Sequence, residues 1–161
     1  GKVLGDGEGR GVGMWNFVPD LLIDIADFKE MKPAINQVET HVFNQQREAQ
    51  DVMRRYGTQI MSWGPFAEGR NGMFTNDGLV ETGRKYGKSA AQVALRFLIQ
   101  RGIVVIPKST HVERMRENFD IFDFELSTSD MDALAALDEK RSQFFSHYDP
   151  STVDFLINYS R

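Results

Sequence analysis

The sequence contains no cysteine among its 161 residues, which excludes disulfide scaffolds, thiolate metal sites and catalysis by a thiol. Histidine is scarce, and His41, His111 and His147 show no spacing typical of a metal site. No apolar run approaches the roughly 20 residues needed to cross a bilayer. The first residues lack the apolar core of a signal peptide. We therefore expect a cytoplasmic protein with no membrane contact and no bound metal.

The sequence also lacks an excess of basic residues. Its 19 Lys and Arg against 23 Asp and Glu give a formal net charge of −4, which argues against a nucleic-acid partner. The composition of 41% hydrophobic and 26% charged residues is that of a folded globular chain rather than a disordered one. The length corresponds to about one domain.

Four short apolar segments alternate with longer amphipathic ones, which predicts βα units. The expected strands are Val12–Trp15, Ala34–Glu39, Thr58–Trp63 and Ile103–Pro107. The last is a continuous β-branched run, which is typical of a strand buried on both faces of a parallel sheet. Four such units would form either a small open sheet or half of an eight-stranded barrel, and the pattern alone does not choose between them.

Capping residues mark where the helices begin. Pro19 starts the first helix, whose apolar face is expected to be Leu21, Leu22, Ile25 and Phe28. Three later starts carry Ser or Thr with a partner side chain three residues on. These pairs are Ser89 with Gln92, Thr110 with Glu113, and Ser127 with Asp130.

One candidate site follows the fourth strand, where Lys108, Ser109 and Thr110 precede a helix that carries Arg114. Free N–H groups at a helix start, together with a lysine and an arginine, can hold a phosphate. The alternative is an ordinary capped βα turn with solvated charges.

A second candidate is Trp63, which ends the third strand and could stack on a heterocycle or fill the core. In the second strand, Asn36 and Gln37 must find partners, in a ligand or in a neighbouring strand. Close by, His41 and Glu39 are interpreted as structural residues, with Glu39 forming an ion pair. The segment Gly5–Gly11 does not match a phosphate-binding glycine pattern and is interpreted as flexible.

Taken in order, several of these segments resemble the aldo-keto reductases, and most closely the bacterial members that include the 2,5-diketogluconate reductases. The resemblance extends from about Val12 to Asp149. Its motifs are Asn16-Phe17, Pro33 to His41, Trp63 to Phe66, Ala91 to Phe97, Ile106 to Ser109, and Glu117 to Phe119.

The resemblance implies a (β/α)8 barrel that binds NADPH across the carboxyl ends of its strands. By position, Asn16 and Gln37 would bond the nicotinamide carboxamide and Trp63 would stack on the ring, with Gly64 and Phe66 of the same motif at the cofactor site. The remaining cofactor residues are those of the last strand and helix. Lys108, Ser109, Thr110 and Arg114 would hold the adenosine 2′-phosphate, and Glu117 and Asn118 would bond the adenine.

The resemblance covers only the second half of the family, strands five to eight, because family members are about twice this length. The residues that the family uses for proton transfer belong to the first half, so no catalytic residue is assigned here. We expect a single half-barrel domain with a glycine-rich lead-in (1–11), four βα units (12–140) and a carboxyl-terminal tail (141–161).

Two functions follow from this division. The chain would be the cofactor-binding half of an NADPH-dependent reductase, acting on a small carbonyl substrate only if the missing half is supplied. Alternatively, it would be a non-catalytic half-barrel or assembly module with at most residual nucleotide binding. In either case the open edges near Val12–Trp15 and Ile103–Pro107 predict self-association. A stand-alone phosphate-binding domain is a third, weaker interpretation.

Overall fold

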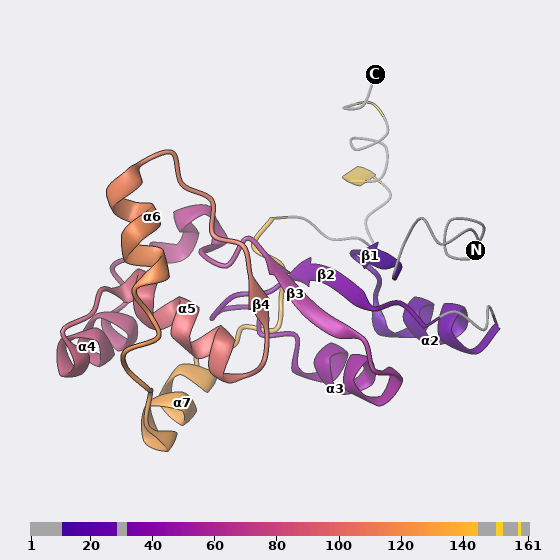
Figure 1. Cartoon of the computed structure of the whole chain (residues 1–161), viewed down its shortest axis with the longest axis horizontal. Helices are drawn as coiled ribbons and strands as arrows, with labels where there is room; N and C mark the ends of the chain where they lie inside the picture. Colours follow the sequence, from indigo (N-terminus) through magenta and orange to yellow (C-terminus); the bar gives the residue numbers. More distant parts are fainter. Residues whose placement is uncertain (1–10, 29–31, 145–150, 153–157, 159–161) are drawn as a thin grey trace.

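The four expected strands lie side by side in one sheet, in the order β1-β2-β3-β4 (Figure 1). The computed structural model describes residues 11–28, 32–144, 151–152 and 158. The strands are β1 (Gly13–Trp15), β2 (Ile35–Glu39), β3 (Gln59–Trp63) and β4 (Val104–Val105). Every neighbouring pair is parallel, because helical segments return the chain between successive strands. The α/β fold with a parallel sheet is therefore confirmed.

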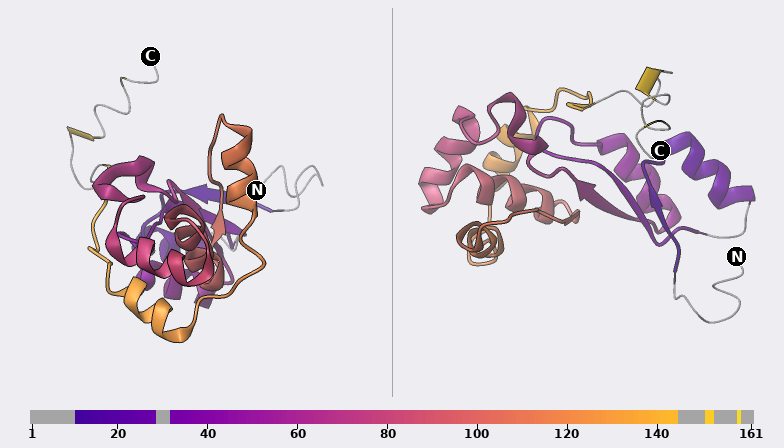
Figure 2. Two further views of the ribbon diagram at one scale, coloured as in Figure 1. Left: turned by 90° about the vertical axis from the view of Figure 1, so that its left-hand side faces the viewer. Right: turned by 90° about the horizontal axis from the view of Figure 1, so that it is seen from above.

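The helical segments divide between the two ends of the sheet. In Figures 1 and 2, α2 lies at the β1 end, whereas α4, α5, α6 and α7 gather at the other end. Their bounds are α2 (Pro19–Phe28), α3 (Arg47–Tyr56), the 3₁₀ segment η1 (Ala67–Gly72), α4 (Asp77–Tyr86), α5 (Ala90–Gln100), α6 (Val112–Phe119) and α7 (Thr128–Ala135).

Two of the three predicted N-caps are confirmed. Ser89 and Gln92 form a complete capping box at α5, and the Ser127 side chain accepts the N–H of Asp130 at α7. The prediction of Thr110 as the cap of α6 is wrong, because that helix begins one residue later, after His111. The His111 side chain makes no capping hydrogen bond, and the Ser109 hydroxyl accepts the His111 N–H at 3.1 Å just before the helix.

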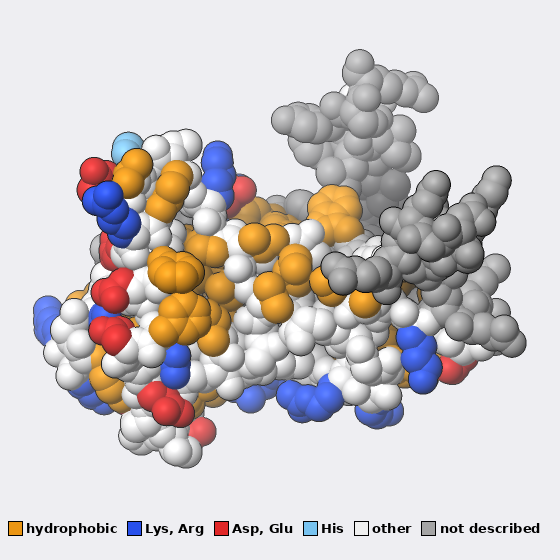
Figure 3. Space-filling model, viewed as in Figure 1, with side chains coloured by type: hydrophobic (Ala, Val, Ile, Leu, Met, Phe, Trp, Pro, Cys, Tyr) orange, Lys and Arg blue, Asp and Glu red, His pale blue; other side chains and the backbone are white. Residues whose placement is uncertain are grey.

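Within the described residues, the core covers one face of the sheet and leaves the other face largely bare. Successive side chains of a strand point to opposite faces, and the core packs on the face that carries Val38 and Ile60, which are almost fully buried. On the other face Trp15 and Val104 are 58% and 42% exposed. In Figure 3, hydrophobic side chains spread over the middle of the molecule and continue towards α6. An apolar sheet face without a covering layer is unusual for a parallel sheet.

Two expectations about burial are wrong. The segment Ile103–Pro107 contributes only a two-residue strand, and it is not buried on both faces, because Ile106 is 51% exposed. β4 lies at the sheet edge and has β3 as its one strand neighbour within the described residues. In α2, Leu21 is exposed while Leu22 and Ala26 are buried, so the buried stripe is rotated from the one expected.

Some predictions concern residues outside the described ranges. They are the glycine-rich lead-in up to residue 10 and most of the aromatic tail beyond Phe144. Within the described ranges, no helix is long and apolar enough to cross a membrane. The same residues contain no cluster of three or more His, Cys, Asp or Glu side chains suited to a metal ion.

Candidate functional site

The carboxyl ends of β1, β2 and β3 bring together the first three predicted site residues. Asn16 follows β1, and its backbone N–H donates to the Gln37 carbonyl at 2.8 Å. The Trp63 indole N–H donates to Asn16 Oδ1 at 2.6 Å. The strand register pairs Trp15 with Gln37 and Glu39 with Trp63, so Gln37 and Trp63 are on the same, bare face of the sheet.

Asn16 has one polar group without a hydrogen-bond partner. Its Nδ2 is buried and finds no acceptor within the described part of the chain, although its Oδ1 is bonded to Trp63. The backbone at Asn16 is left-handed, with φ of 56°, and asparagine tolerates this conformation better than most residues. A buried amide donor without an acceptor is costly, so the amide is suited to a ligand carbonyl.

The last strand and helix bring the second group of predicted residues to one cavity of about 550 Å³. Neither Lys108 nor Arg114 forms a salt bridge with any residue that the structure describes. Two cations without counter-ions beside hydroxyl groups are suited to an anion such as phosphate. The predicted residues that line this cavity are Phe66, Lys108, Ser109, Thr110, Arg114, Glu117 and Asn118.

One contact from α5 fixes the Glu117 side chain. The Ser89 hydroxyl donates to Glu117 Oε1, and Gln92 Nε2 donates to the Glu117 carbonyl at 3.2 Å. The N-terminus of α5 and the C-terminal part of α6 are thereby joined beside the cavity. A carboxylate held in this way can accept a hydrogen bond from an exocyclic amine.

Gly64 and Phe66 connect the two groups of residues. Gly64 has φ of 62°, a left-handed conformation that turns the chain sharply after Trp63. Two residues later Phe66 lines the 550 Å³ cavity, where it packs on Phe74 with ring centroids 5.5 Å apart. A ligand that extends along this turn would reach from Trp63 to Lys108.

Asn36 and Glu39 of β2, and His41 just after it, find partners within the protein. Asn36 is fully buried, and its amide bonds the backbone N–H and carbonyl of Phe17. His41 is fully buried, with its Nε2 3.0 Å from Glu39 Oε1. The geometry therefore supports the interpretation of His41 and Glu39 as structural residues, which are joined here by a hydrogen bond.

Sequence reasoning missed one segment of the site, Ser142–Phe144, which we call the strap. Ser142 Oγ donates to Glu39 Oε2 at 2.5 Å, and the Gln143 N–H donates to Glu39 Oε1 at 2.8 Å. The Phe144 ring then packs on Trp63, with centroids 5.0 Å apart. No rule of sequence spacing connects residues about 100 positions apart. The one hint in the sequence was Glu39, an acid in an expected strand, which needs a hydrogen-bond partner if it is buried.

Several curated proteins are similar to this chain in sequence. Glyoxal reductase of Bacillus subtilis is 41% identical over 138 residues, which are 86% of this chain and 49% of that protein. Aldose reductase B of Dictyostelium discoideum is 38% identical, over 84% of this chain and 44% of that protein. The chain therefore spans about half the length of the curated relatives it matches.

Solved structures give the same result for the fold. An aldo-keto reductase from a Medee basin deep-sea metagenome library superposes with a TM-score of 0.87 at 31% identity, covering 92% of this chain and 54% of that one. The silkworm (Bombyx mori) aldo-keto reductase complexed with NADPH superposes with a TM-score of 0.83 at 31% identity, covering 89% and 47%. A model of the Aldo/keto reductase family matches residues 3–139, and this chain therefore belongs to that family.

Proposed function

We propose that this chain forms the carboxyl-terminal half of a (β/α)8 barrel and binds NADPH there. It would be the cofactor-binding half of a reductase that acts on small aldehydes or ketones. The observation that carries the proposal is the 550 Å³ cavity lined by Lys108 and Arg114, two cations with no salt bridge to a described residue. A 2′-phosphate supplies the two negative charges that such a pocket lacks.

The residues present fit the other parts of the same cofactor. Asn16 Nδ2 is a buried donor without an acceptor in the described residues, and a carboxamide oxygen would satisfy it. Gln37, on the same face as Trp63, would bond the carboxamide beside it, and Trp63 would stack on the ring. At the other end, Glu117 would accept from the adenine amine. Reduced nicotinamide, when bound, supplies the hydride for carbonyl reduction.

Carbonyl reduction also needs a proton donor beside the developing oxyanion, and we assign no residue of this chain to that role. We therefore propose that a carbonyl substrate is reduced only when a complementary half-barrel supplies the acid. The bare sheet face and the exposed Val104 support a closing partner. A second copy of this chain could close the open edges by pairing edge to edge, but it would not supply the acid, since we assign none to this chain.

The bare face also supports the second function, a half-barrel module that assembles without catalysing. The two functions differ in whether the phosphate pocket must bind a nucleotide. The reductase half must bind NADPH there, whereas an assembly module needs no nucleotide. A cytoplasmic location, expected from the sequence, stays a prediction.

Calorimetric titration of the purified chain with 2′,5′-ADP and with 5′-AMP tests the proposal. These ligands differ by the 2′-phosphate alone, so the proposed pocket should bind 2′,5′-ADP at least about tenfold more tightly, the effect of one charge-assisted hydrogen bond. Equal affinity, or no binding of either ligand, would refute the NADPH assignment. The assembly function would then be favoured.

A further inference from the structure

The strap spans the carboxyl ends of β2 and β3 and is anchored on both sides. Ser142 and Gln143 bond the Glu39 carboxylate on β2. On the other side, Arg70 of η1 donates to the Gln143 carbonyl at 2.8 Å, and the Asn71 amide donates to the Gln143 side chain. The strap therefore connects the end of β2 with the segment that follows β3.

The chain that leads into the strap is also fixed to the loop after β2. The Gln45 N–H donates to Asp138 Oδ1 at 3.0 Å, and the Glu139 N–H donates to the Phe43 carbonyl at 2.8 Å. The strap thus begins from a fixed point. Within the described residues, the contacts of Ser142–Phe144 then place the Phe144 ring.

Glu39 accepts three hydrogen bonds in a buried position. The Phe43 N–H donates to His41 Nδ1, so the ring proton of neutral His41 is on Nε2 and is donated to Glu39. Burial alone would raise the pKa of Glu39, but the donors His41, Ser142 and Gln143 outweigh it and hold that pKa below its usual value. The carboxylate is charged at neutral pH, and both of its oxygens accept hydrogen bonds.

Phe144 is enclosed by the groups around the end of β3. Besides Trp63, it contacts the His41 ring, with centroids 6.4 Å apart, and the Arg70 guanidinium lies 4.6 Å from its ring centroid. A Cβ at Gly64 would lie 3.4 Å from the Phe144 ring, so the turn after Trp63 fits closely against it. The indole is then held at its N–H by Asn16 and on one side by Phe144.

We propose that Glu39 is a positioning residue that acts through the strap. By holding Ser142 and Gln143, it keeps Phe144 packed on Trp63 and so fixes the indole on which a nicotinamide ring would stack. This inference rests on the proposed NADPH function. It adds Glu39, a residue that would assist cofactor binding without touching the cofactor. The benefit is preorganisation, because an indole that is already fixed loses no freedom when a ring stacks on it.

Glu39→Gln and Phe144→Ala test the inference. The amide in Glu39→Gln offers one acceptor oxygen where three donors converge, and its NH₂ group would face a donor. Both variants should bind NADPH about five- to tenfold more weakly, the scale of one side chain newly immobilised on binding. Both should bind 2′,5′-ADP within about twofold of the unchanged protein, since that ligand has no nicotinamide. The matched controls are Glu125→Gln and Phe122→Ala, which change exposed side chains.

Emission of Trp63, measured in a Trp15→Phe background without ligand, gives an independent result. Releasing the strap should shift this emission to longer wavelength in Glu39→Gln and Phe144→Ala but in neither control. An equal loss of affinity for NADPH and 2′,5′-ADP would overturn the inference, as would unchanged NADPH affinity or unchanged emission. If the unaltered protein bound neither ligand, the proposed function would fail and the nicotinamide role with it. The emission shift would then still decide whether Glu39 and Phe144 hold the indole.

Discussion

Substituting Arg114 by Ala should weaken NADPH binding and leave NADH binding almost unchanged. Arg114 lines the same cavity as Lys108 and Ser109, and a guanidinium–phosphate hydrogen bond contributes about 1.5–3 kcal/mol. Because Arg114 is exposed in the chain, solvent and salt screen the interaction, so we expect the lower value, about a tenfold loss of affinity. NADH has a hydroxyl in place of the 2′-phosphate, so it offers no charged group for the Arg114 side chain to bind.

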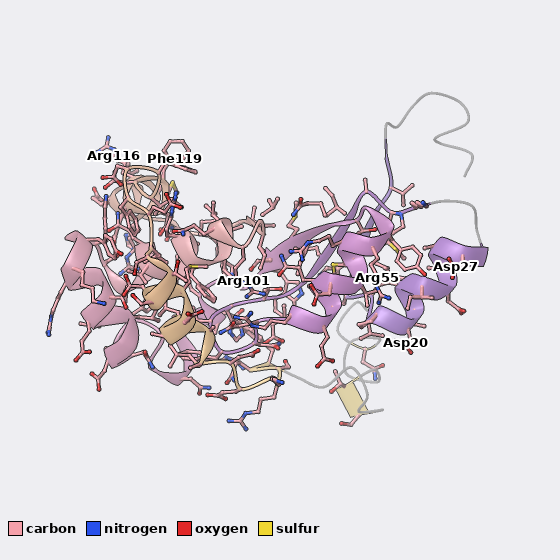
Figure 4. All side chains as sticks on the ribbon, turned by 90° about the horizontal axis from the view of Figure 1, so that it is seen from below. Asp20, Asp27, Arg55, Arg101, Arg116 and Phe119 are labelled. Carbon is pink, nitrogen blue, oxygen red and sulfur yellow. The ribbon has the colours of Figure 1, made fainter. Side chains whose placement is uncertain are left out.

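Calorimetric titrations with both nucleotides measure this difference directly. Arg116→Ala is the matched control, because it removes the same charge from the same helix. Arg116 lines a different cavity with Phe119, at the position labelled in Figure 4. Raising the salt concentration should reduce the difference between the unaltered chain and Arg114→Ala. Equal losses for NADPH and NADH, or an equal loss in Arg116→Ala, would refute the assignment of Arg114 to the phosphate.

Three further predictions concern stability and assembly. Asp130→Asn should lower the free energy of unfolding at pH 7 by about 1.5–3 kcal/mol, since its buried carboxylate bonds Lys85 at 2.5 Å and Tyr86 at 2.6 Å. These donors hold the pKa of Asp130 well below its usual 3.8. The contribution of Asp130 to the free energy of unfolding is therefore fully present above about pH 3.8, the pKa in the unfolded chain. It disappears as the pH falls through the lower pKa of the folded state. Gly83→Ala should destabilise the junction of α4 and α5 by about 1–3 kcal/mol, because its Cβ would lie 2.3 Å from the Lys88 carbonyl oxygen. Light scattering should show self-association of the chain and a shift towards monomer in Val104→Lys, since a lysine on an edge strand opposes pairing.

Each of these predictions has a control. Asp132→Asn changes an exposed carboxylate of the same helix and should leave urea unfolding unchanged, so equal effects at both positions would contradict the role of the buried network. For Gly83→Ala, an unfolding midpoint equal to that of the unaltered chain would show that the junction can move aside. Leu21→Lys places the same charge on an exposed leucine of α2. Dissociation by both lysine variants, or a monodisperse monomer of the unaltered chain, would contradict pairing through β4.

Local signals in the sequence predicted the order of the elements because their causes are local. Ser89 with Gln92 and Ser127 with Asp130 cap their helices as expected, since a cap involves residues three positions apart. Thr110 does not cap α6, because the helix begins one residue later, after His111. The exact residue at which a helix begins depends on backbone angles that the sequence pattern does not contain.

The motifs proposed Asn16, Trp63 and Lys108 as site residues, and this role stays a prediction. In the fold, Asn16 follows β1, Trp63 ends β3, and Lys108 comes after β4. The strap could not be found in this way. Its contact with Glu39 joins residues more than 100 positions apart, and only the folded chain shows which acid meets which hydroxyl.

The mismatch at β4 has a different physical cause. The run Ile103–Pro107 has the continuous apolar character of a strand buried on both faces, yet Val104 and Ile106 are 42% and 51% exposed. On α6, Phe119 is 77% exposed and packs with its ring 5.6 Å from that of Phe122. Exposed apolar residues scattered singly need no explanation, but here they gather on the edge strand and on the helix that follows it. If the proposed closing half-barrel exists, the exposed apolar residues of β4 and α6 form the surface at which it should be sought.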